Sequence, residues 1–261
     1  MQDHISVSQF NTFSRCELQW FFRYIMGYVV APTGNLTLGK ATHYGVEYAY
    51  QSIQKEDKFN GSECIDRSRD YIQHDVETEW DKLSKGEAVD HAVGMTKTYI
   101  ESDPIHQVHQ PDVVGTEMKA GIVVPLDGGD RAIVSGYADI ILKDTVIDIK
   151  TSASKQKKAT GYNYLQNSVY AHHFGYKTSE VHSLSYTKKG TQLNSFGVPI
   201  METQVLAFLI AGFWNKLKEN SLVDVEPKEK MKLFSPTGIV HSWACSYCGY
   251  GKQGLCPFKL K

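Results

Sequence analysis

Residues 136–150, GYADIILKDTVIDIK, decide the fold expected for this chain. They contain most of two apolar stretches, predicted as strands at 131–142 and 145–150, which a short turn at residues 143–144 connects. Each strand carries one acid, Asp139 or Asp148, among apolar residues. A carboxylate buried in a strand is costly unless it is paired or binds a metal. Asp148 and Lys150 lie two residues apart and therefore face the same side of one strand, and Asp139 reaches the same point from the neighbouring strand.

Two carboxylates that converge at a sheet edge form a hard oxygen site, which suits Mg²⁺ or Mn²⁺. Such an ion lowers the pKa of a bound water and stabilises charge on a phosphate group. Lys150 is placed to position that water or to neutralise the developing oxyanion. The alternative is a solvated ion pair on an edge strand, because D-x-K is a common tripeptide. The surrounding elements therefore have to decide between the two.

Those elements alternate between helical and extended patterns. Helices are predicted at 6–25, with Ser6 or Ser8 as the cap, and at 38–53, 63–84, 87–102, 159–175 and 201–219. Further strands are predicted at 112–126 and 180–187, and residues 127–130 (DGGD) form a hairpin turn. The order indicates an α/β (α+β) fold with a mixed central sheet flanked by helices.

The chain has 261 residues, of which 41% are hydrophobic and 22% charged, as in an ordinary globular protein. We expect a single domain over 1–261, with a helical insertion at 51–110. The formal net charge of −1 does not by itself indicate nucleic acid. No membrane-spanning run or signal peptide is evident, so we expect a cytoplasmic protein without a membrane partner.

Cysteines gather near the end of the chain. Cys245 and Cys248 have C-x2-C spacing, Cys256 follows, and Cys16 is the candidate for a fourth ligand, whereas Cys64 is the odd one out. We therefore predict a metal clasp that joins residues 1–25 to 241–261. Structural Zn²⁺ and an iron–sulfur cluster both remain open, because ligand count does not separate them. Either metal closes a loop of more than 200 residues and removes several kcal/mol of unfolded-state freedom, to order of magnitude.

Four motifs in family order give a specific resemblance. GKATH at 39–43 with Glu47 resembles the GxxxHxxxE signature of RecB-type nucleases of the PD-(D/E)XK superfamily. GYAD (136–139), VIDIKTS (146–152) and the Q-x3-Y pair of Gln166 and Tyr170 resemble the other three. The resemblance implies a restriction-endonuclease-like core, and it extends to AddB and to RecB-like exonucleases of CRISPR adaptation modules.

By this resemblance, the metal ligands are His43, Asp139, Asp148 and the backbone carbonyl of Ile149. Lys150 is the catalytic lysine, and Gln166 and Tyr170 contact DNA or orient the site. Glu117 is a candidate accessory acid, and Glu47 is equally well explained as a solvated helix acid. His172 and His173 are interpreted as structural.

The cysteines also have a counterpart in this group. AddB-like iron–sulfur nucleases join one N-terminal cysteine to three C-terminal ones on a [4Fe–4S] cluster, which favours iron–sulfur over zinc here. Two departures bear on the cluster type. Glu17 stands where the family has proline after its first cysteine, and seven residues separate Cys248 from Cys256.

Residues 34–41, GNLTLGKA, nearly match a P-loop, but Ala41 stands where the Mg²⁺-binding hydroxyl belongs. A P-loop hydrolase also needs repeated βα units, whereas residues 38–110 are predicted to be almost wholly helical. Nucleotide hydrolysis is therefore the weaker alternative.

Residues 150–190 hold seven lysines and a single acid, Glu180. Lys155, Lys157 and Lys158 directly follow the D-x-K strand and are predicted to contact DNA phosphates, and Tyr162 is placed to stack a base. The resemblance implies an exonuclease that acts on DNA ends and prefers single strands, in recombination, repair or CRISPR adaptation, with proteins of those pathways as partners. A non-catalytic DNA-end-binding iron–sulfur subunit is the alternative.

Overall fold

The computed structural model describes residues 4–126, 129–221, 229, 231–234, 245 and 248–256. The chain divides into two compact units. Unit 1 comprises Met1–Ala31, Val123–Ser135 and Glu202–Lys261, and unit 2 comprises Pro32–Ile122 and Gly136–Met201. Two of the four divisions between the units fall inside strands, namely β2 (Val113–Pro125) and β3 (Arg131–Leu142).

Unit 2 is built on a mixed sheet with the order β3-β4-β5-β6, and β2 also pairs with β3. The strand β4 (Thr145–Ser152) is antiparallel to β3 and parallel to β5 (Thr178–Thr187). Helix α7 (Gly161–Phe174) connects β4 to β5. The mixed sheet predicted from the sequence is confirmed. The strand β6 (Gly190–Gly197), which completes a hairpin with β5, was not predicted because GTQLNSFG lacks a clear apolar alternation.

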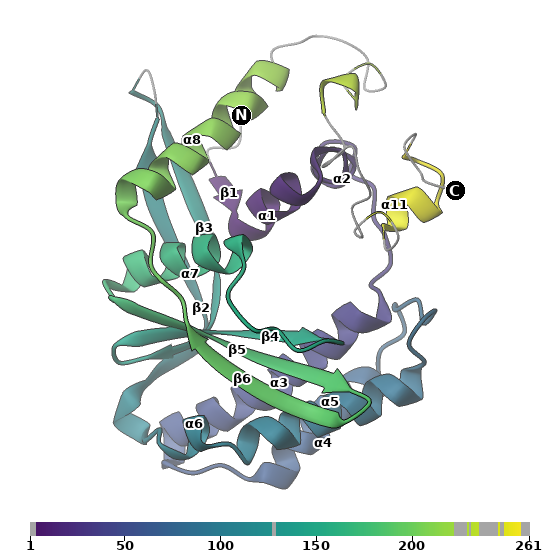
Figure 1. Ribbon diagram of the computed structural model, residues 1–261, viewed down its shortest axis with the longest axis vertical. Coiled ribbons are helices and arrows are strands. Elements are labelled where there is room, and N and C mark those ends of the chain that lie inside the picture. The colour runs from purple at the N-terminus through teal and green to yellow at the C-terminus, as the bar shows by residue number, and fades with distance from the viewer. Residues whose placement is uncertain are drawn as a thin grey trace. The chain divides into compact units, whose positions relative to one another are not determined.

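Helices cover both faces of this sheet (Figure 1). One face carries α3 (Gly34–Glu56), α4 (Gly61–Gln73) and α5 (Lys85–Ile100), followed by the short helices α6 (Asp103–His106) and η1 (Gln110–Asp112). The opposite face carries α7. The predicted helix at 63–84 was too long, because the chain turns back after Gln73 and Thr33 forms a β-bridge with Glu79.

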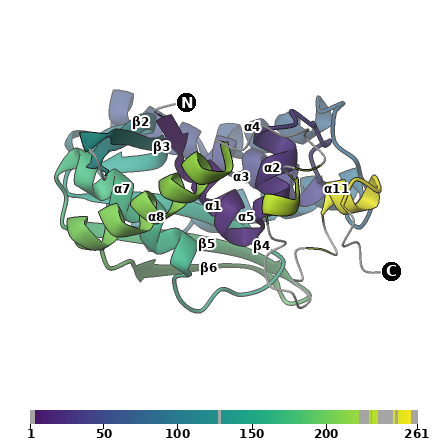
Figure 2. The ribbon, with the colours of Figure 1, turned by 90° about the horizontal axis from the view of Figure 1, so that it is seen from above.

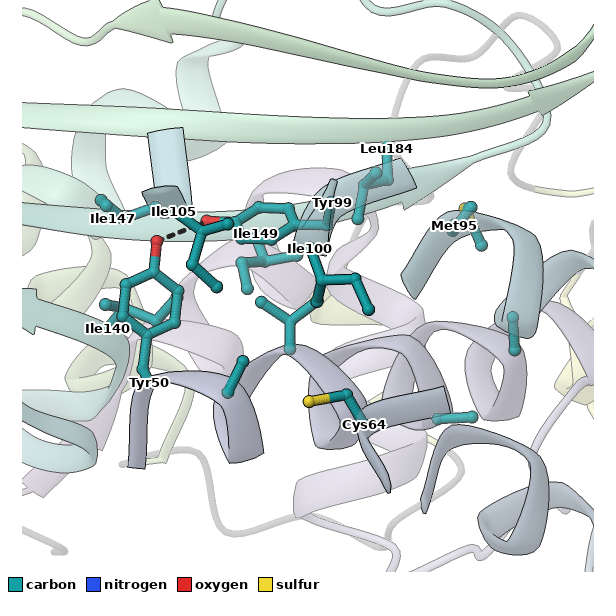
Figure 3. Close-up of a cluster of buried hydrophobic side chains, with 14 of the residues drawn as sticks. Tyr50, Cys64, Met95, Tyr99, Ile100, Ile105, Ile140, Ile147, Ile149 and Leu184 are labelled. Atoms are coloured by element: carbon teal, nitrogen blue, oxygen red, sulfur yellow. Dashed lines mark hydrogen bonds between the residues drawn. The ribbon is translucent and has the colours of Figure 1, made fainter. Parts of the chain in front are cut away.

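The core of unit 2 lies between the sheet and helices α3–α5 (Figure 3). Ile147 and Ile149 of β4 point into it together with Leu184 of β5. A line of polar groups crosses the same core. The hydroxyls of Tyr50 and Tyr99 lie 2.9 Å apart, and the Tyr99 hydroxyl lies 2.7 Å from Nδ1 of His182. These bonds satisfy buried polar groups that would otherwise destabilise the fold.

Small residues let the three helices approach closely. A Cβ at Gly45 of α3 would lie 2.7 Å from the carbonyl oxygen of Cys64 on α4 and 2.9 Å from Cγ2 of Thr96 on α5. A larger residue at position 45 would therefore push both neighbouring helices away from α3.

Unit 1 contains β1 (His4–Ser6), which pairs in parallel with the first half of β3. Ser6 caps α1 (Val7–Arg15) in a capping box with Gln9, as one of the two predicted caps. The single helix predicted at 6–25 was wrong, because Cys16 is extended, with φ −162° and ψ 109°, and separates α1 from α2 (Glu17–Tyr24). Part of the predicted DGGD turn, residues 127–128, lies outside the described residues.

Aromatic rings hold unit 1 together. Phe213 of α8 (Thr203–Ser221) lies 4.6 Å, centroid to centroid, from Phe13 of α1. Near the C-terminus, η3 (Met231–Leu233) is followed by Phe234, whose ring stacks on Phe21 at 4.9 Å. The short helix α11 (Gly249–Lys252) lies beside α2, through Tyr250 and Phe22 at 5.5 Å (Figures 1 and 2).

Gly45→Ala is expected to destabilise the protein by about 1–3 kcal/mol, because the added methyl group overpacks the α3–α4–α5 contact. Glycine-to-alanine changes in open helix positions have the opposite effect, stabilising by up to about 1 kcal/mol. Gly86→Ala in α5 is the matched control, since nothing lies within 4 Å of its Cβ position. Urea unfolding followed by circular dichroism measures both, and a Gly45→Ala protein at least as stable as wild type would refute the packing argument.

Candidate active site

The polar side chains predicted to form a site all belong to unit 2 and come from four elements. Helix α3 carries His43, β3 carries Asp139, β4 carries Asp148 and Lys150, and α7 carries Gln166 and Tyr170.

Strand β4 alternates between core and site. Ile147 and Ile149 face the core, whereas Asp148 points to the opposite side and is only 1% exposed. Its Oδ1 accepts two hydrogen bonds, from Nζ of Lys150 at 2.6 Å and from Nε2 of Gln166 at 2.8 Å. The predicted same-face arrangement of Asp148 and Lys150 is therefore present, but the pair is buried on its acidic side and is not a solvated edge-strand pair.

Asp139 lies where β3 and β4 stop pairing. The two strands are paired at Ile140–Ile147, so the next step of the register places Asp139 opposite Asp148. The carboxylate Oδ2 of Asp139 accepts a hydrogen bond of 2.7 Å from the backbone N–H of Ile149. This bond holds the acid in the sheet and leaves it beside Asp148.

His43 approaches from α3, which runs close to β4 because of Gly39. A Cβ at Gly39 would lie 2.9 Å from Oγ1 of Thr151. Nδ1 of His43 then lies 3.6 Å from Oδ2 of Asp139 and 3.8 Å from Oε1 of Glu47, one helical turn further along α3. Both distances are too long for a hydrogen bond. Glu47 is 9% exposed, so it is not a solvated helix acid.

Glu117 joins this group from β2. Its φ of +49° is in the left-handed region, which non-glycine residues seldom adopt, and such strain is frequent at functional sites. Ligand atoms of His43, Glu117 and Asp139 all lie within 4.8 Å of one another. Sequence reasoning gave Glu117 only as an accessory acid, because nothing in its local pattern reveals the backbone conformation that directs it here.

Tyr170 depends on a glycine in β3. A Cβ at Gly136 would clash with the Tyr170 hydroxyl, so only glycine leaves room for the phenol. Tyr170 is 3% exposed and lies one helical turn beyond Gln166. The two residues of the Q-x3-Y pair thus contact the site differently. Gln166 donates a hydrogen bond to Asp148, and Tyr170 packs on Gly136.

Burial disfavours ionisation of two acids at the site. Burial raises the pKa of Asp148 to about 6, although Lys150 opposes the shift. Burial, together with the charges of Glu117 and Asp139, raises the pKa of Glu47 to about 8. For Lys150, burial lowers the pKa, but the charges of Asp148 and Asp139 outweigh it, so the pKa is raised overall and the amine stays protonated.

A divalent cation fits this donor set. Within the described part of the chain, Oδ2 of Asp148 is buried without a hydrogen-bond donor, a state that costs free energy unless a cation satisfies it. Two ligand atoms bound to one Mg²⁺ at about 2.1 Å lie at most about 4.2 Å apart. The 3.6 Å between His43 and Asp139 is compatible with that limit.

The PD-(D/E)XK nuclease superfamily model matches residues 4–257. This chain belongs to the PD-(D/E)XK nuclease superfamily. Members of the superfamily are metal-dependent nucleases, which agrees with the donor set. A solved structure described as the crystal structure of SSO0001 is similar at 15% sequence identity, covering 94% of this chain and 96% of that chain, with a TM-score of 0.41. No curated protein matches the sequence significantly.

The remaining predicted residues lie outside this cluster. Lys155, Lys157 and Lys158 are exposed in the segment between β4 and α7, and Tyr162 is 39% exposed at the start of α7. Residues 34–41 are helical from Gly34 onwards, so they do not form the loop that a P-loop requires. Among the described helices, none has the length and apolar character needed to cross a membrane.

Cys16, Cys245, Cys248 and Cys256 all belong to unit 1, whereas Cys64 is buried in unit 2. The C-terminal segment packs on the chain that follows α2. The Tyr250 hydroxyl donates to the Tyr28 carbonyl oxygen at 3.1 Å. Much of the predicted clasp, including 241–244, 246–247 and 257–261, lies outside the described residues.

In a chelating buffer, Glu47→Gln is expected to stabilise the protein increasingly as pH rises. The folded pKa of about 8 exceeds the ordinary value of 4.5. Below about pH 4.5 the Glu47 carboxyl is neutral in both the folded and the unfolded protein, and its contribution to the free energy of unfolding is greatest. That contribution is lost as pH rises through about 8. Over that window the free-energy difference between variant and wild type should grow by at most about 1.4 kcal/mol per pH unit.

Thermal unfolding of both proteins at several pH values in EDTA measures this difference. Glu56→Gln, which changes an exposed acid on the same helix, is the control and should show no comparable trend. A difference between Glu47→Gln and wild type that stays constant with pH would contradict the assignment.

Proposed function

We propose that this protein is a Mg²⁺- or Mn²⁺-dependent deoxyribonuclease that degrades DNA from its ends and prefers single strands. The observation that carries the proposal is the buried, unsatisfied Oδ2 of Asp148 beside Asp139, with the ammonium of Lys150 on the other carboxylate oxygen. A cation completes the site electrostatically. The residues that would hold it are His43, Asp139, Asp148 and the backbone carbonyl of Ile149.

A bound Mg²⁺ or Mn²⁺ supplies a water of lowered pKa and neutralises charge on the phosphate. The chain's own groups do the rest. Lys150 is placed to orient the attacking water and to neutralise charge that develops on the phosphate oxygens. The water oxygen bonds to phosphorus, the bond to the leaving sugar oxygen breaks, and that oxygen takes up a proton. Gln166 restrains Oδ1 of Asp148, and Tyr170 packs behind it.

The preference for ends rests on the resemblance to RecB-type nucleases, and the surface near the site supports binding of a single strand. Lys155, Lys157 and Lys158 follow β4 directly and are exposed, which suits contacts with phosphates. Tyr162 offers a ring on which an unpaired base can stack. Recombination, repair or CRISPR adaptation would supply such substrates, in a reducing compartment such as the cytoplasm, with proteins of those pathways as partners.

A non-catalytic DNA-end-binding subunit is the competing function. It requires the same fold and basic surface but has no need for Lys150 against Asp148. Because a catalytically silent subunit gains nothing from a carboxylate oxygen buried without a donor, the intact acid and lysine set favours catalysis.

Asp148→Ala and Lys150→Ala are each expected to lower the rate of DNA degradation by roughly 10²-fold or more, because the first removes a ligand of the proposed cation and the second removes the ammonium that neutralises charge on the phosphate. The assay follows an end-labelled linear single strand in the presence of Mn²⁺ or Mg²⁺. Asp144→Ala in the turn before β4 and Lys177→Ala before β5 are the matched controls and should retain activity.

Circular single-stranded DNA of the same sequence tests the requirement for ends and should resist degradation. Equal activity of wild type and Asp148→Ala would refute the catalytic assignment. Rapid cutting of the circle would refute the exonuclease assignment alone.

We further propose that Cys16, Cys245, Cys248 and Cys256 hold a structural [4Fe–4S] cluster. Two observations support this proposal. All four cysteines belong to the same unit, and Cys16 lies at an extended residue between two helices, where its side chain is not committed to a helix face. Zn²⁺ is the alternative, because four thiolates also suit it.

Protein purified without oxygen is expected to contain iron and acid-labile sulfide. Cys16→Ala and Cys248→Ala should lose both and unfold more easily, by several kcal/mol to order of magnitude, because the long loop is no longer closed. Cys64→Ala is the control that keeps the metal. Zinc without sulfide would refute the iron–sulfur cluster and support a structural Zn²⁺ site. A Cys248→Ala protein with unchanged metal content and stability would refute the clasp.

A further inference from the structure

Helix α3 carries a second stripe of side chains beside the one that enters the site. Gly39, His43 and Glu47 recur every four residues and face the acids. Lys40, Tyr44 and Tyr48 each follow one of them, at a rotation of about 100° around the helix. The second stripe therefore runs alongside the first for its whole length.

Arg67 of α4 lies against this second stripe. Its guanidinium carbon is 3.8 Å from the centre of the Tyr48 ring, and its Nη1 donates to the Tyr44 hydroxyl at 3.3 Å. Nη2 is 3.4 Å from Oε1 of Glu63, one turn earlier on α4. The Tyr71 ring lies 5.8 Å from the Tyr44 ring. The guanidinium is thus fixed in orientation by three neighbours before any ligand arrives.

Two of these side chains are well exposed, whereas Tyr48 and Tyr71 are half-buried and pack against the core of unit 2. Tyr44 is 43% exposed and the Arg67 side chain 37%. The close α3–α4 contact is made by other residues, with Gly45 approaching Cys64 and Ser68. Packing of the helices therefore leaves the Tyr44 ring and the Arg67 guanidinium at the surface, with Tyr48 beneath the guanidinium.

We propose that the exposed Tyr44 and Arg67, supported from below by Tyr48 and Tyr71, form a stacking platform for the bases of a single DNA strand that runs along α3 to the metal site. The platform rests on the proposed nuclease function and specifies its substrate. Unpaired bases stack on aromatic rings and on guanidinium planes, and this requires no particular sequence. A duplex hides those base faces.

The charge around the platform determines whether the bases or the phosphates of the DNA strand contact it. Helix α4 also carries Glu63, Asp66 and Asp70, and Arg67 and Arg69 pair with only the first two, so Asp70 leaves this helix surface net acidic and unfavourable for phosphates. The exposed Lys40 lies at the start of the stripe on α3, where it can contact a phosphate. The bases therefore face α4, and the sugar–phosphate backbone faces away from it.

Binding without cleavage tests the platform. The full-length protein is titrated in EDTA against a fluorescein-labelled oligo-dT, and against an abasic oligonucleotide of the same length, with fluorescence anisotropy as the readout. Tyr44→Ala and Arg67→Ala are expected to weaken oligo-dT binding by about fivefold or more, the lower end for loss of one stacked base. Binding of the abasic strand should not change, and Tyr44→Phe should bind like wild type.

Tyr176→Ala, which removes another partly exposed tyrosine of unit 2, is the matched control and should leave both affinities unchanged. Circular dichroism melting verifies that each variant is folded. The platform is refuted if Tyr44→Ala binds oligo-dT like wild type, if both probes weaken equally, or if wild type does not bind oligo-dT.

Failure of the platform and failure of the proposed catalysis give different results in these experiments. If Asp148→Ala cleaves DNA like wild type while Tyr44→Ala loses oligo-dT affinity, the catalytic assignment fails and the platform stands. If cleavage depends on Asp148 but Tyr44→Ala binds both probes normally, the platform alone fails.

Discussion

One buried carboxylate organises unit 2. Asp148 lies in β4 between Ile147 and Ile149, which are both in the core, so the strand cannot turn the acid towards solvent without exposing them. The charge must therefore be balanced where it is. Lys150 and Gln166 balance one oxygen, and the other has no donor within the described residues. Burial in this strand therefore favours binding of a cation, and the neighbouring elements contribute the other candidate ligands.

The convergence of those elements depends on where side chains are missing. Gly39 lets α3 reach β4 at Thr151, and Gly136 makes room for Tyr170. In each case a single methyl group would occupy the space that the neighbour fills. The glycines of GxxxH and of GYAD are thus spacers that set how closely the helix, the two strands and α7 meet. The reactive side chains beside them are useful only at that separation.

The sequence predicts the fold and the site correctly where a short stretch of residues is sufficient to determine the local structure. The alternation in TVIDIK places Asp148 and Lys150 on one face, and a two-residue turn brings Asp139 beside them. Other features depend on tertiary context. The extended conformation of Cys16 interrupts a pattern that is helical on both sides. The role of Glu117 depends on a positive φ in an ordinary-looking strand, and the burial of Glu47 depends on which elements cover α3.

The two candidate metal sites lie in different units, although their residues alternate along the sequence. Every side chain of the proposed metal site belongs to unit 2, and all four cysteines of the proposed clasp belong to unit 1. A metal in the proposed clasp would therefore bind segments of unit 1, whose aromatic contacts include Phe22 with Tyr250. The two metals have different chemistry for the same reason. Thiolates form a closed, soft site suited to holding chain segments, whereas carboxylates and an imidazole form a harder site in which water can remain bound. Because each proposed donor set lies within its own unit, loss of the clasp would remove no donor atom from the proposed cation site.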